Sequence, residues 1–151
     1  MEGRCTCGAV KFKLTSNPLF VHCCHCSWCQ RETGSAFVIN ALIEADRVVL
    51  LEGTPESVLT PTNSGKAQKI ARCPKCRIAL WSNYGGIDVL DFVRVGTLDE
   101  PGRLPPDIHI YTASKLPWVA LPAGVPAVGE YYQSSELWPR ASLDRRRALF
   151  G

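Results

Sequence analysis

One stretch of eight residues constrains this chain more than any other. Residues 22–29 contain four cysteines and two histidines, and Cys24, Cys26 and Cys29 follow the spacing Cys-x-Cys-x-x-Cys. Residues i and i+2 of an extended segment face the same side, so the first two thiols converge, and the x-x turn returns the third to them. The spacing therefore predicts one small ion held by three thiolates.

The number of ligands decides what such an ion can do. Tetrahedral zinc with three protein ligands keeps one position for a reacting molecule, whereas four ligands make a closed, structural site. Cys23 should face away from Cys24 and pack as a small buried apolar group, and His25 should also point away from the ion. An alternative partition uses Cys23, His22 or His25 as a fourth ligand, which would close the site.

The other four cysteines form two pairs far apart in the sequence. Cys5 and Cys7 again have the i, i+2 spacing, and Cys73 and Cys76 frame a Cys-x-x-Cys turn. We favour joining all four in one closed zinc site with a structural role. A redox dithiol is disfavoured because no βαβ periodicity surrounds the turn. Disulfides are disfavoured because the N-terminus has no apolar signal region, which favours the cytoplasm, where thiols stay reduced.

Length and charge limit the remaining possibilities. The 151 residues are expected to form one domain, residues 1–151, with ordinary shares of 46% hydrophobic and 21% charged residues. No run of about 18 apolar residues is present, so we expect no membrane partner. The formal charge of +3 counts every cysteine as neutral, and seven thiolates with two zinc ions would reduce it to zero. We therefore expect no nucleic acid partner, and the oligomeric state stays open.

Short alternating or apolar segments dominate the rest of the chain. Val10, Phe12 and Leu14 alternate with polar residues, which is typical of a half-buried strand. Residues 36–43 are largely apolar, which indicates a strand buried on both faces. Further strands are expected at 19–21, 48–51, 57–60, 67–72, 78–82, 89–95 and 107–113. The pattern predicts a mainly β fold built of short strands.

Little helix is expected. Four prolines between Pro105 and Pro122 exclude a long helix there. Residues 30–35 have room for one helical turn. Residues 142–150 favour a helix with Ser142 as its N-cap, and its inward residues would be Leu143, Ala148 and Leu149.

Three segments together resemble a known family. They are Cys5-x-Cys7-Gly8, Cys24-His25-Cys26-x-x-Cys29 with Gly34-Ser35 after it, and Cys73-Pro74-x-Cys76. Over residues 3–125 the chain is similar to the glutathione-dependent formaldehyde-activating family, also called the GFA or CENP-V domain. His109-Ile110-Tyr111, followed by Trp118, fits the same pattern. The resemblance implies an Mss4-like zinc-containing β fold.

The resemblance also implies an activity and two zinc ions per chain. A structural zinc would lie on Cys5, Cys7, Cys73 and Cys76, and a catalytic zinc on Cys24, Cys26 and Cys29. The family's activity is the condensation of glutathione with formaldehyde, classed as carbon–sulfur lyase chemistry, and other thiols or small aldehydes would suit the same chemistry. The alternative is a zinc-stabilised binding module without catalysis.

Substrate contacts are expected beside the metal. Glutathione carries two carboxylates, so a site for it should present Arg or Lys. Arg31 is nearest in sequence, and Trp28 and Trp118 are candidates to line the pocket. The other candidates for the cationic group are Arg72, Arg77 and Lys115.

The chain departs from the family's pattern at two positions. The family usually has glycine where this chain has Arg77, and a left-handed backbone there would cost a non-glycine residue about 1 to 2 kcal/mol. A differently shaped turn would avoid that cost. Cys23 is an additional cysteine beside the three-thiol motif.

Overall fold

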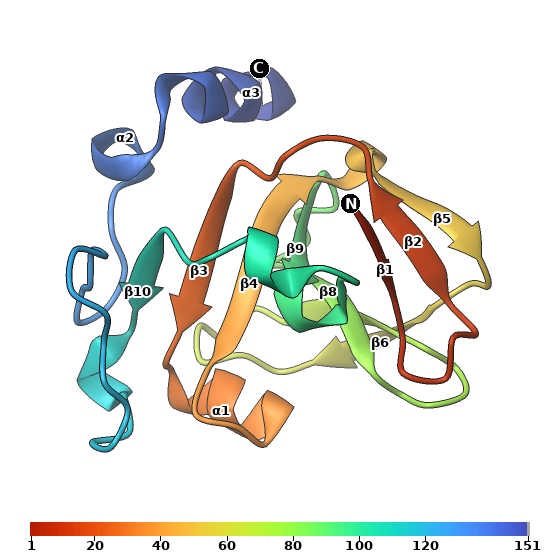
Figure 1. The fold of residues 1–151 in the computed structure, drawn as a ribbon, viewed down its shortest axis with the longest axis horizontal. Coiled ribbons are helices and arrows are strands. Elements are labelled where there is room, and N and C mark those ends of the chain that lie inside the picture. Colours follow the sequence, from red (N-terminus) through yellow and green to blue (C-terminus); the bar gives the residue numbers. More distant parts are fainter. Residues whose placement is uncertain (151) are drawn as a thin grey trace.

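The strands form two sheets, which confirms the mainly β fold (Figure 1). The structure, a computed structural model, describes residues 1–150. The three-stranded sheet has the order β1-β2-β5, made of β1 (Glu2–Arg4), β2 (Lys11–Leu14) and β5 (Val48–Glu52). The seven-stranded sheet has the order β10-β3-β4-β9-β8-β7-β6. Its strands are β3 (Phe20–Cys24), β4 (Val38–Glu44), β6 (Glu56–Thr60), β7 (Gln68–Arg72), β8 (Ala79–Tyr84), β9 (Leu90–Arg94) and β10 (Ile108–Ile110). Among the strands of residues 1–150, only β10 pairs in parallel with another strand, β3.

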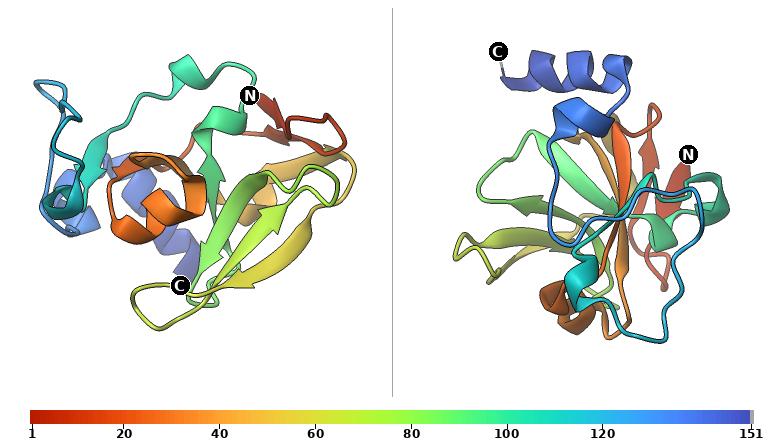
Figure 2. Two further views of the ribbon diagram at one scale, coloured as in Figure 1. Left: turned by 90° about the horizontal axis from the view of Figure 1, so that it is seen from below. Right: turned by 90° about the vertical axis from the view of Figure 1, so that its left-hand side faces the viewer.

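The helices lie at two ends of the molecule. Helix α1 (Ser27–Thr33) lies at the end opposite α3 (Arg140–Phe150), as Figures 1 and 2 show. The short α2 (Ser134–Leu137) precedes α3. Single 3-10 turns occur at η1 (Ala45–Arg47), η2 (Val95–Thr97), η3 (Pro101–Arg103) and η4 (Thr112–Ser114). Within residues 1–150, no helix has the length and apolar character needed to cross a membrane.

Two clusters of buried side chains cover the two faces of β3 and β4. The first joins the sheets, since Phe12 of β2 packs in one cluster with Val21 and Ile43. The second contains Phe20 and is covered by the C-terminal segment through Trp138. Phe20 and Val21 are neighbours on β3 and belong to different clusters, as the alternation of side chains in a strand requires. The alternation places Cys23 and Cys24 on opposite faces as well.

The boundaries of three elements differ from the sequence expectation. Helix α1 is longer than one turn because the Cys26 thiol caps its start, and Gly34, at φ 65°, ends it. Strand β10 stops at Ile110 because Tyr111 adopts a left-handed φ of 55°. The N-cap prediction for Ser142 was wrong: the helix begins earlier, at Arg140, and Ser142 is buried inside it.

The inward face of α3 is also smaller than expected. Leu143 and Leu149 pack against the second cluster, but Ala148 is exposed. Ser142 and Leu149 are seven residues apart and share the inward face of the helix, whereas the side chain of Ala148 is turned by about 100° from that of Leu149.

Asp91 provides a pH-dependent test of the packing in β9. The side chain is buried and accepts a hydrogen bond from Asn83 Nδ2 at 2.6 Å, and burial raises its pKa from 3.8 to about 6. A carboxyl whose pKa is higher in the folded than in the unfolded state opposes folding once it ionises. The stability of the protein therefore falls as pH rises from about 4 through 6. We expect Asp91→Asn to stabilise the protein by roughly 3 kcal/mol at pH 8 and by little at pH 4.

Urea unfolding of both proteins between pH 4 and 8 checks this expectation. The difference between the two curves isolates Asp91, because all other groups titrate equally in both. A constant difference across this range would contradict the raised pKa.

Candidate metal centres and the adjoining cavity

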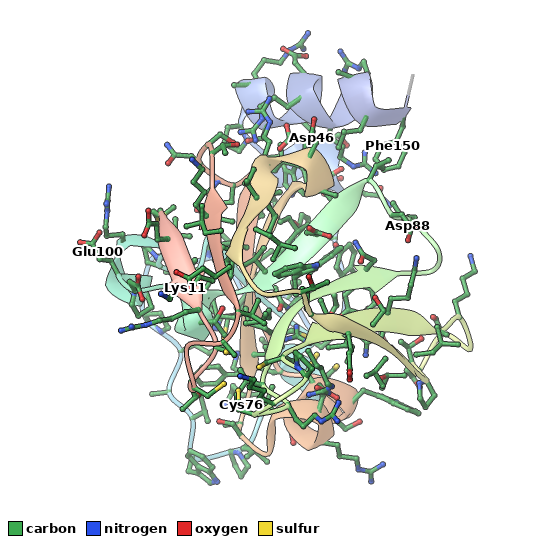
Figure 3. The ribbon with its side chains drawn as sticks, turned by 90° about the vertical axis from the view of Figure 1, so that its right-hand side faces the viewer. Lys11, Asp46, Cys76, Asp88, Glu100 and Phe150 are labelled. Carbon is green, nitrogen blue, oxygen red and sulfur yellow. The ribbon has the colours of Figure 1, made fainter. Side chains whose placement is uncertain are left out.

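The four cysteines that the sequence analysis joins do lie together. Cys5 and Cys7 follow β1, Cys73 and Cys76 connect β7 to β8, and the four sulfur atoms lie within 4.8 Å of one another. The Sγ atom of Cys7 lies 3.6 Å from Sγ of Cys5 and 3.7 Å from Sγ of Cys73. Figure 3 shows Cys76 at the end of the molecule opposite α3. The cluster thus joins the three-stranded sheet to the seven-stranded sheet.

The spacing and electrostatics of this cluster suit a zinc ion. Zn–S bonds of about 2.3 Å place tetrahedral sulfurs about 3.8 Å apart, whereas a disulfide needs about 2.05 Å. Backbone N–H groups of Cys7 and Ile78 lower the pKa of Cys76 to about 6. The N–H of Val10 donates to Cys5 Sγ at 3.3 Å. These N–H groups stabilise thiolates, the form of cysteine that binds metal.

Arg77 follows the second pair of cysteines in a left-handed conformation, with φ at 64°. Its N–H donates to the carbonyl of Cys73 at 2.9 Å, which closes the turn. The turn therefore has the left-handed backbone that favours glycine, although this chain has Arg77 at that position.

We expect Arg77→Gly to stabilise the zinc-loaded protein by about 0.5 to 1 kcal/mol. The left-handed conformation costs a non-glycine residue about 1 to 2 kcal/mol, and the lost ion pair with Glu56 is exposed and contributes little. Urea midpoints at equal m-value give the measurement. Lys75→Gly is the control in the same turn, because Lys75 is exposed and has no positive φ. Lys75→Gly should lower the stability of the protein. An equal loss of stability in Arg77→Gly would contradict the strain at Arg77.

The second predicted group, Cys24, Cys26 and Cys29, also converges. Its three sulfur atoms lie within 4.8 Å of one another. Cys24 ends β3, Cys26 caps α1, and Cys29 lies in the first turn of α1. The Cys29 N–H donates to Cys26 Sγ at 3.3 Å, and the sulfurs of Cys24 and Cys29 are 3.5 Å apart. The capping of α1 is therefore what brings the third thiol to the other two.

The three thiols cannot all ionise without a cation among them. Hydrogen bonds from Cys24 and Cys29 lower the pKa of Cys26, so this thiol ionises first. Interaction with Cys24 and Cys26 raises the pKa of Cys29 well above its ordinary value. Three thiolates at this separation repel one another unless a positive ion lies between them. The donor set, three sulfurs within 4.8 Å of one another, fits zinc.

Cys23 does not join these three thiols. It is buried in a separate cluster, with its Sγ 3.6 Å from Nε2 of His25. Burial raises the pKa of Cys23 to about 12, which keeps the thiol protonated. The structure therefore favours the small buried thiol over the fourth-ligand alternative.

His25 also points away from the three thiols and contacts His109. Nε2 of His25 lies 2.9 Å from Nδ1 of His109, the length of an N–H···N hydrogen bond. The other ring nitrogen of each has no hydrogen-bond partner among residues 1–150. Histidines that bind metal nearly always donate that second N–H to an acceptor. We therefore interpret Cys23, His25 and His109 as a hydrogen-bonded cluster rather than a third ligand set.

A cavity of about 450 Å³ adjoins the three thiols. Its apolar wall includes Phe92 and Ile110, and its polar wall includes Asn40, Gln68 and Arg94. His22 also lines the cavity. Its Nε2 forms a hydrogen bond of 2.5 Å with the hydroxyl of Tyr132 rather than with one of the three thiols. The cavity gives the three-thiol group an approach for a small molecule.

The predicted substrate residues divide between the cavity and the surface. Trp28 lines the cavity, whereas Arg31 is exposed and Trp118 is 73% exposed, and neither lines it. Arg72 forms an ion pair with Glu32, and Lys115 donates to the carbonyl of Val119.

Sequence reasoning missed Gln68, Arg94 and Tyr111 in the cavity wall. A signal for Arg94 was present, because it is a charged residue inside a segment expected to be a buried strand. Nothing in the sequence distinguishes Gln68 from any polar residue of a strand.

The chain is similar to known proteins in sequence and in fold. The family model described as glutathione-dependent formaldehyde-activating enzyme matches residues 1–114. A protein of Halomonas elongata whose name contains the same enzyme name is 29% identical over 126 residues, which cover 80% of each chain. The crystal structure of a Rhodobacter sphaeroides protein has a TM-score of 0.50 and 24% identity, covering 66% of this chain and 88% of the other. That last likeness supports the fold alone.

Proposed function

Because this chain belongs to the glutathione-dependent formaldehyde-activating enzyme family, we propose that it joins a thiol, glutathione or a similar molecule, to formaldehyde or another small aldehyde. The sulfur–carbon bond forms while the carbonyl π bond breaks, and the thiol proton ends on the former carbonyl oxygen. The reverse reaction is that of a carbon–sulfur lyase. One observation carries the proposal: three thiols converge at the wall of a cavity with room for a small substrate.

The proposal includes two zinc ions per chain. Cys5, Cys7, Cys73 and Cys76 would hold a structural ion, and Cys24, Cys26 and Cys29 a reactive one. A zinc ion with three sulfur ligands supplies a Lewis acid and lowers the pKa of a thiol that binds it. Reduced cysteines are needed for both ligand sets, so we place the protein in the reducing cytoplasm.

In this proposal the transferred proton is handled by Tyr111. It lines the cavity, and burial and the thiols of Cys24 and Cys26 raise its pKa, so its hydroxyl stays protonated. Its N–H donates to the carbonyl of Glu130 at 2.8 Å, which holds the left-handed backbone. In the proposed reaction the hydroxyl donates a hydrogen bond to the aldehyde oxygen as negative charge develops there.

The direct test mixes the zinc-loaded protein with glutathione and formaldehyde. Nuclear magnetic resonance follows formation of the hydroxymethyl adduct, and we expect a rate above that of the reaction without protein. A chelator should remove one of the two ions much faster than the other. Two inert ions with no acceleration for any thiol would support the zinc-stabilised binding module instead.

A further inference from the structure

The cavity beside the three thiols contains a buried arginine without an anionic partner. Arg94 is 6% exposed, yet it forms none of the ion pairs found within residues 1–150. Its Nη1 donates to Asn40 Oδ1, and its Nη2 donates to Ser82 Oγ at 3.0 Å. Its Nε has no partner. The guanidinium is thus held in place by neutral groups, and no carboxylate of residues 1–150 pairs with it.

The neighbouring phenol does not supply the missing charge. Tyr84 lines the same cavity, and burial raises its pKa to about 12 in spite of the opposing effect of Arg94. It therefore remains a neutral hydroxyl. A buried guanidinium without a carboxylate partner has the charge and the donor groups to bind an anion that enters from the cavity.

A second unpartnered polar group lines the cavity with Arg94. Gln68 is also 6% exposed, and its Oε1 has no hydrogen-bond partner among the described residues. A carboxamide oxygen accepts hydrogen bonds, so it requires a donor such as an N–H group. The cavity therefore offers a site for an anion and a site for an N–H donor.

We propose that Arg94 binds a carboxylate of the thiol substrate and that Gln68 accepts a hydrogen bond from an N–H group of the same molecule. Arginine matches the planar carboxylate with two parallel N–H donors. A carboxylate together with an N–H group is the chemistry of amino acids and peptides. Arg94 and Gln68 would then be the residues that select the thiol substrate, an assignment that rests on the proposed thiol-binding function of the cavity.

The test measures binding of S-methylglutathione, whose sulfur cannot react, and of its dimethyl ester to the zinc-loaded protein by calorimetry. We expect esterification to weaken binding to the unmodified protein about 100-fold. In Arg94→Met the acid and the ester should bind equally. Gln68→Leu should weaken binding of the acid by about tenfold. Arg31→Met is the matched comparison, since it removes a charge from the exposed face of α1.

Several results would overturn the proposal. These are equal binding of acid and ester to the unmodified protein, an ester effect that persists in Arg94→Met, and an ester effect that disappears in Arg31→Met instead. Unchanged binding in Gln68→Leu would overturn the N–H contact. If Arg94→Met fails to fold, the comparison of acid and ester on the unmodified protein still decides whether a carboxylate is bound.

The proposed reaction and the proposed carboxylate site can fail separately. Binding is measured without aldehyde, so the carboxylate site stands or falls whether or not the adduct forms. Acceleration that is equal for glutathione and its dimethyl ester would support the reaction and overturn the carboxylate site.

Discussion

Replacing Cys73 by serine is expected to abolish the cooperative unfolding transition of this protein. Cys73 is fully buried and joins the connection between β7 and β8 to the segment after β1. Zinc binding contributes roughly 10 to 16 kcal/mol to folding in zinc-finger peptides, whereas a whole domain is stable by only about 5 to 15 kcal/mol. A serine hydroxyl at this position also leaves a buried polar group without its metal. The variant should therefore lack a stable fold.

Circular dichroism during heating and zinc analysis after dialysis provide the measurements. Cys23→Ala is the matched control, because Cys23 is equally buried and lies outside both proposed ligand sets. It should cost about 1 kcal/mol and keep both ions. A folded Cys73→Ser variant that retains two zinc ions would contradict the structural role of the four-cysteine cluster.

Replacing Cys26 by serine is expected to have the opposite profile: loss of activity with the fold intact. Cys26 is partly exposed and caps α1 through its sulfur. Serine is among the best capping residues, so the helix should persist and the unfolding midpoint should change little. Loss of one of three metal ligands should release the second zinc ion and reduce adduct formation by at least about 100-fold.

Zinc content, the unfolding midpoint and the rate of adduct formation are the three measurements for Cys26→Ser. If this variant unfolds as completely as Cys73→Ser, the division into a structural and a reactive site is wrong. If it retains two zinc ions and full activity, the three-thiol group is not the reactive site. Cys23→Ala again serves as the control for removing a nearby thiol.

Local spacing was enough to predict which thiols converge. Cys24 and Cys26 are two residues apart, and Cys73 and Cys76 frame one turn, so backbone geometry alone brings each pair together. The spacing predicts a turn that brings Cys29 back to Cys24 and Cys26. It does not predict that this turn is the start of helix α1. The reason is that Cys26 starts α1 with its own sulfur, and cysteine is not among the residues that usually signal a helix start.

The residues that line the cavity were predicted less completely, for a related reason. Arg31 was favoured because it is close to the thiols in sequence, yet it lies on the exposed face of α1. Arg94 is 65 or more residues from each of the three thiols in the sequence and still lines the same cavity. The pairing of β4 with both β3 and β9 produces this proximity.

By itself, the sequence determined the mainly β class, the two groups of thiols and the family, because these depend on residue type, periodicity and short spacings. Only the tertiary structure decided that Cys23 lies outside the three-thiol group and that Arg94 and Gln68 share its cavity. Which face a strand residue presents, and what lies opposite it, depends on the register between strands distant in the chain. Register is set by the packing of both faces at once, and no short segment contains that information.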